Sequence, residues 1–124
     1  MRIQDLNNYY FHDSGLLKIE HINTSITLTI LYSLFMQEEY QDGEPENSLV
    51  TLTFDNIINY DIPDRELHND NIIEVKTDGN KCTFSVQNSY TDEFYMFSIE
   101  AESVEFSTIK IIDDLKEFYN ENNL

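Results

Sequence analysis

Basic side chains are scarce in this sequence. Its 124 residues contain 7 Lys and Arg against 24 Asp and Glu, which gives a formal net charge of −17 with the three His neutral. A protein that binds DNA or RNA needs a basic surface for the phosphates, and docking on anionic lipid needs the same. The composition therefore argues against direct binding to nucleic acid or to a membrane.

Cysteine and long apolar runs are also nearly missing. Cys82 is the single cysteine, so the sequence has no internal disulfide and no zinc site built on several thiolates. We expect Cys82 to be a small buried residue. No run approaches the ~18 apolar residues of a membrane span, and the first residues lack the apolar stretch of a signal peptide. We therefore expect a cytoplasmic protein.

Glycine is too rare for a phosphate-binding loop, since it occurs only at positions 15, 43 and 79. The motifs GxSxG, GxGxxG, HExxH and CxxC are absent as well. Carboxylates are abundant, but a general acid also needs burial and a raised pKa, which spacing alone does not reveal. We therefore predict no enzymatic activity, no catalytic residue and no cofactor.

What the sequence does contain is alternation of apolar and polar residues, which is typical of half-buried strands. With 40% hydrophobic and 13% aromatic residues, the chain has enough apolar surface for one core, and we expect a single domain over residues 1–124. The alternation predicts four clear strands and two weaker ones. These are Ser25–Ile30, Leu49–Phe54, Lys81–Val86 and Tyr95–Ala101, and then Leu16–Ile22 and Ile72–Lys76.

Two local signals add detail to these strands. Asp78-Gly79 lies between two alternating runs and predicts a β-hairpin with positive φ at both residues. The alternation also changes phase between Ala101 and Val104, which predicts a bulge or break near Glu102-Ser103.

Beyond the phase change, the apolar residues follow a helical period at Ile109, Ile112, Leu115 and Phe118/Tyr119. Ser107 or Thr108 is then the expected N-cap. The predicted fold class is α+β and mainly β: an antiparallel sheet of about six strands, in one or two layers, with a C-terminal helix. A β-sandwich without the helix is the alternative.

The distribution of charge suggests a binding surface. No Lys or Arg occurs between Lys18 and Arg65, or between Lys81 and Lys110. Unpaired acids repel one another but steer a basic partner toward the protein. The candidate partner-binding residues are Glu38, Glu39, Tyr40, Asp42, Glu44 and Glu46, extended by Glu100 and Glu102 on one strand face. The alternative is that the acidity serves only solubility.

The histidines give weaker candidates. His12, Asp13 and His21 flank the first predicted strand and could hold a cation, although none has the spacing of a prepared ligand pair. The favoured interpretation is that these are ordinary surface or hydrogen-bonded side chains, so no metal site is predicted.

Two apolar segments have more than one interpretation. Tyr9-Tyr10-Phe11 either locks the N-terminal segment onto the core or forms part of an interface. Leu31–Met36 has apolar residues on both faces, which implies cover on both sides or a dimer contact. The chain is thus expected to be a monomer or a homodimer.

Several segments resemble the small, acidic, β-rich immunity proteins of bacterial polymorphic toxin systems. They are Phe11–Ser14, Leu17–Ile19, the Thr-rich strand ending near Ile30, Leu52–Asn56 and Phe97–Glu102, and the resemblance extends over about half of the chain. The resemblance implies a protein that binds a cognate toxin, often a nuclease, and blocks it; it implies no catalytic residues.

The first hypothesis is therefore an acidic protein that neutralises a basic protein partner, as an immunity protein or inhibitor of a nuclease-type toxin. A phage-encoded inhibitor of a host nuclease would use the same charge mimicry. The other hypotheses are a self-associating structural or interaction module and, after it, a small metal-binding protein.

Overall fold

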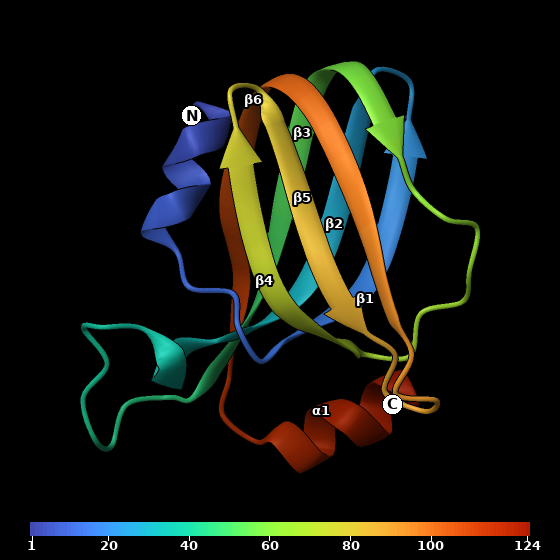
Figure 1. The fold of residues 1–124 in the computed structure, drawn as a ribbon. Coiled ribbons are helices and arrows are strands. Elements are labelled where there is room, and N and C mark those ends of the chain that lie inside the picture. The colour runs from blue at the N-terminus through green and yellow to red at the C-terminus, as the bar shows by residue number, and fades with distance from the viewer.

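The computed structural model describes residues 1–124, and its six strands form one closed antiparallel barrel (Figure 1). The strands follow one another around the barrel in the order β1-β2-β3-β6-β5-β4, and β4 returns to β1. The elements are η1 Ile3–Asn8, β1 Ser14–Ile22, β2 Ser25–Ser33, η2 Leu34–Met36, β3 Asn47–Asp61, β4 Asp70–Asp78, β5 Lys81–Gln87, β6 Phe94–Ile112 and α1 Leu115–Asn122. Neither α1 nor the two 3-10 segments is long and apolar enough to cross a membrane.

All six predicted strands are present, and the prediction of an antiparallel, mainly β fold with a C-terminal helix is confirmed. The closure of the sheet into a barrel was not predicted. It depends on the pairing of β1 with β4, which consists of Ser14 with Ile72, Gly15 with Asn71 and Leu16 with Asp70. A pairing between residues so far apart in sequence leaves no trace in the local alternation.

The long strands β3 and β6 pair over most of their length and bend together. Ala101 and Val104 are both buried whereas Glu102 is exposed, so the predicted phase change in β6 is confirmed. β3 makes the same change opposite, because Phe54 is buried, Ile57 packs on the core, and Asn56 between them has a φ of 54°. Both strands shift phase at the same place, so their register continues through the bend.

Two details of the predicted C-terminal helix are wrong: it does not include Ile109, and neither Ser107 nor Thr108 is its N-cap. The residues between Ser107 and Ile112 are strand, because they pair with β3, and the helical spacing at Ile109 arises where the register of β6 shifts by one residue. The helix begins after Asp114, whose carboxylate accepts a hydrogen bond from the Glu117 N–H at 3.0 Å.

The predicted β4–β5 hairpin is confirmed, but its two loop residues are Gly79 and Asn80, since Asp78 pairs with Lys81. Gly79 has a φ of 59°, while Asp78 belongs to the strand.

Asparagine and aspartate take most of the left-handed backbone positions in this glycine-poor chain. Their short polar side chains tolerate positive φ better than other non-glycine residues do. The six residues of this kind are Asp13, Asn23, Asn56, Asn69, Asp92 and Asn123.

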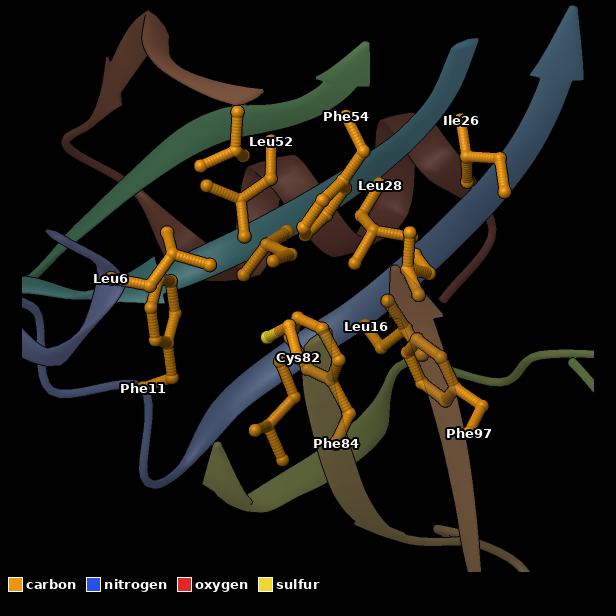
Figure 2. Close-up of a cluster of buried hydrophobic side chains, with 14 of the residues drawn as sticks. Leu6, Phe11, Leu16, Ile26, Leu28, Leu52, Phe54, Cys82, Phe84 and Phe97 are labelled. Carbon is orange, nitrogen blue, oxygen red and sulfur yellow. The ribbon is translucent and has the colours of Figure 1, made fainter. Parts of the chain in front are cut away.

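The barrel interior holds one apolar core that is rich in phenylalanine (Figure 2). The rings of Phe84 and Phe97 stack with centroids 4.7 Å apart, and Phe54 meets Phe84 edge-on. Cys82 lies in this core with no exposed surface, as predicted, and burial raises the pKa of its thiol to about 12. A second, smaller cluster joins α1 to the outside of the barrel through Leu31, Ile112 and Phe118.

The segment η1 fills an open corner of the barrel. Past Glu100, β6 no longer pairs with β5, and η1 lies in the resulting gap between β6 and β4. Its Ile3 and Leu6 are fully buried, and the Val104 N–H donates to the Met1 carbonyl at 3.0 Å. Tyr9 then stacks on Phe106 with centroids 4.4 Å apart.

The aromatic run after η1 therefore locks the N-terminal segment onto the core, which was one of the two predicted roles. Phe11 is buried beside Tyr32, whereas Tyr10 remains 53% exposed.

Truncating Leu6 to alanine should lower the free energy of unfolding by about 2–5 kcal/mol, because the side chain is fully buried and leaves a cavity. Urea denaturation measures this loss. The matched control is Ile58→Ala, since Ile58 is 55% exposed and its loss should cost less than about 0.5 kcal/mol. Equal effects of the two substitutions would show that η1 does not contribute to the core.

Candidate functional site

The segment 37–46 projects from the barrel between η2 and β3, at the lower left of Figure 1. Its base is closed by hydrogen bonds from the N–H groups of Leu34 and Phe35 to the Glu46 carbonyl. At its tip the Tyr40 hydroxyl donates to the Glu44 carbonyl at 2.9 Å, and the Glu44 carboxylate accepts from the Gln41 N–H. The loop therefore presents its acids on a backbone with defined internal contacts.

The loop lies beside the junction of β6 and α1, because Asn47 at its end pairs with Ile112. A hollow of about 300 Å³ between them is lined by Glu44, Glu46 and Asp113, among others. Asp113 also lines the neighbouring hollow along α1. We call this surface the acidic end; its carboxylates are those of Glu38, Glu39, Asp42, Glu44, Glu46, Asp113, Asp114, Glu117 and Glu121.

None of the nine carboxylates of the acidic end takes part in an ion pair. The six ion pairs of the protein all lie elsewhere. Lys110 lines the hollow along α1 and Lys116 lies on α1, but neither forms an ion pair with these acids. The pKa of the Tyr40 hydroxyl is raised, first by partial burial and then by the charges of Glu46, Asp42 and Glu44. Three carboxylates of the loop thus act on one side chain between them.

Sequence reasoning found the loop part of this surface but not the helix part. The acids before and on α1 were not among the predicted residues, because the pairing of Asn47 with Ile112 that brings Asp113 to the loop is a long-range contact. A second set was misplaced. Glu100 pairs with Asn59 and Lys81 near the β4–β5 hairpin, so Glu100 and Glu102 lie at the other end of the barrel and do not extend the patch.

The structure does not gather the three weak metal candidates either. The imidazole of His12 contacts the Ile73 carbonyl through Nδ1 at 2.9 Å and lies 3.6 Å from the Asp13 carboxylate. His21 instead meets the ring of Tyr60 edge-on, with centroids 4.8 Å apart. No group of three or more His, Cys, Asp or Glu side chains is arranged to hold a metal ion.

A hollow that the sequence did not indicate opens between β1 and the segment 62–69, which runs along the right side of Figure 1. We call it the lateral hollow. It has a volume of about 470 Å³ and combines an apolar wall with a few polar side chains. The lining residues are Leu17, Lys18, Ile19, His21, Tyr60, Ile62, Pro63, Asp64, Arg65, Leu67, Tyr95 and Phe97.

Beside the lateral hollow, a buried carboxylate fixes one of the lining rings. Asp70 has no exposed surface, and it accepts a hydrogen bond from the Tyr95 hydroxyl at 2.6 Å. The N–H groups of His68 and Ser89 donate to its other oxygen at 3.3 Å. Burial and then the Asp70 carboxylate raise the pKa of Tyr95, so its hydroxyl remains a donor at neutral pH.

Comparisons with protein-family models, with curated proteins and with solved structures find no match to this chain. Its function is therefore argued from its own residues.

Replacing Tyr95 with phenylalanine should lower the free energy of unfolding by about 1–3 kcal/mol, because Asp70 stays buried and loses its shortest hydrogen bond. Urea denaturation of the variant measures the loss. Tyr90→Phe is the matched control, since that side chain is 75% exposed and the same change should be nearly neutral. A neutral Tyr95→Phe would mean that the buried carboxylate does not need this donor.

Proposed function

We propose that the protein binds and neutralises a basic protein partner through its acidic end, as an immunity protein or inhibitor of a nuclease-type toxin does. The observation that supports this best is the lack of ion pairing among the nine carboxylates. Surface acids that serve only solubility can be interspersed with bases, which relieves their repulsion. Here two segments far apart in sequence bring unpaired acids to one surface, where they cost stability.

The partner class follows from the charge. A site that handles nucleic acid must present bases to phosphates, and B-DNA carries one charge per ~1.7 Å of its axis. Nine carboxylates match the charge on roughly 15 Å of duplex on that scale. A surface of this kind can occupy a basic cleft in place of nucleic acid, and its field speeds the encounter. Tyr40 supplies an aromatic side chain within it.

A phage-encoded inhibitor of a host nuclease would use the same surface, so it shares the support for the first proposal. The hypothesis of a self-associating module has less support. It relied on a free strand edge or on the apolar faces of Leu31–Met36. Strand edges are unpaired only at the two corners of the barrel, beyond Leu16 of β1 and beyond Glu100 of β6, while Leu31 is covered by α1 and Tyr32 belongs to the core.

The acidic end can be tested by moving charge while keeping net charge constant. One variant reverses Glu38, Glu39, Asp42 and Glu44 to Lys. The other reverses four exposed acids outside the acidic end, Asp61, Asp78, Glu102 and Glu105. Each variant has a net charge of −9, because the wild-type charge is −17 and each of the four changes from an acid to Lys raises it by two.

The measurement is retention of a basic protein from the native host lysate on columns of wild type and both variants, at low and high salt. We expect retention by wild type and by the second variant. Retention by the acidic-end variant should fall about 10-fold, and salt should release the partner. Equal retention by both variants, with circular dichroism showing both folded, would overturn the proposed surface.

A further inference from the structure

The barrel has two corners at which neighbouring strands lose their partners, and only one of them is filled. At the first corner η1 inserts Ile3 and Leu6, both fully buried. At the second corner β1 continues beyond Leu16 with no pairing to β4, and the segment 62–69 passes beside it. The lateral hollow lies there and reaches Phe97, a residue of the main core.

The lining of the lateral hollow holds more bases than acids. Lys18 and Arg65 line it against a single acid, Asp64, and each contacts one glutamate outside the lining, Glu20 and Glu93. In the chain as a whole, acids outnumber Lys and Arg by 24 to 7. Three of the other hollows, two of them along the acidic end, have linings in which acids predominate.

Arg65 has hydrogen-bond donors to spare. Its guanidinium lies over the ring of Tyr95, 3.9 Å from the centroid, and that ring is fixed by the hydrogen bond to Asp70. One nitrogen contacts Glu93 at 3.3 Å, while the Nε–H is buried with no acceptor. A guanidinium carries five N–H groups, so this single contact leaves most of them unused.

Lys18 is in a similar position at the rim. Its ammonium lies 3.2 Å from Glu20, the side chain is 62% exposed, and two of its three donors remain free for another acceptor.

The apolar part of the lining fits a hydrocarbon group. Leu17, Ile19, Ile62 and Leu67 are all partly buried, and Phe97 closes the inner end. The volume of about 470 Å³ falls within the 300–1,000 Å³ that is usual for small-molecule sites.

We propose that the lateral hollow binds a small amphipathic carboxylate, with its hydrocarbon part against the aliphatic wall and its carboxylate at Arg65 and Lys18. Fixed positive groups must overcome the negative field of the whole protein. Screening makes this feasible, since at physiological salt charges beyond about 8 Å count little against donors in direct contact. This site is separate from the acidic end and does not depend on the proposed partner.

The test uses three probes of equal chain length: decanoate, decanol and decylammonium. Their binding is followed by NMR of the methyl groups of Leu17, Ile19, Ile62 and Leu67. We expect decanoate to shift these methyls saturably below about 1 mM, and to bind at least about 10-fold more tightly than decylammonium, a difference of about 1.4 kcal/mol.

Substitutions then separate charge from apolar contact. Lys18→Gln and Arg65→Gln should each weaken decanoate about 10-fold and leave decanol unchanged. Lys76→Gln is the matched control, because Lys76 also pairs with a glutamate two residues away on a strand but does not line the hollow. Lys18 is exposed, so its variant should fold even if Arg65→Gln does not.

Three results would overturn the proposal. The first is the absence of a saturable shift at these methyls with decanoate. The second is tighter binding of decylammonium than of decanoate, which would mean that the overall negative charge of the protein determines which probe binds. The third is equal affinity of wild type and Lys18→Gln for decanoate.

Discussion

The pairing of β3 with β6 is the constraint on which the rest of the structure depends. These two strands run side by side from Asn47 opposite Ile112 to Asp61 opposite Ser98, and they bend together at Asn56 and Glu102. Because both change phase at the same point, each supplies inward residues to both halves of the barrel. The shorter strands β1, β2, β4 and β5 complete the wall around them, and the open corners lie where these shorter strands end.

The same pairing also positions both candidate sites. At one end of β3 the register brings the 37–46 loop to the start of α1 and so assembles the acidic end. At the other end the chain leaves β3, crosses beside β1 as the segment 62–69, and encloses the lateral hollow. The two sites differ in charge and lie on different segments. A surface for a macromolecule and a hollow for a small molecule can therefore coexist on one barrel.

Local patterns predicted the elements of this fold because those elements are determined locally. Alternation identified every strand, and the phase change at Glu102-Ser103 identified the bend. The error at Ile109 had the opposite origin, since pairing with β3 outweighs a helical spacing that one register shift happens to create. Closure of the barrel, the neighbourhood of Glu44 and Asp113, and the lateral hollow all depend on contacts between distant segments. No spacing within a single segment encodes them.

Two of the acidic residues have a conformational role, because they occupy left-handed backbone positions. Asp13 and Asp92 both have positive φ, and the four other non-glycine residues of this kind are asparagines. The chain has only three glycines, so Asn and Asp residues occupy backbone positions with positive φ that glycine usually occupies. Some of the negative charge is thus a by-product of backbone geometry. Evolution could replace Asp13 or Asp92 with asparagine at little conformational cost and thereby tune the net charge without rebuilding a turn.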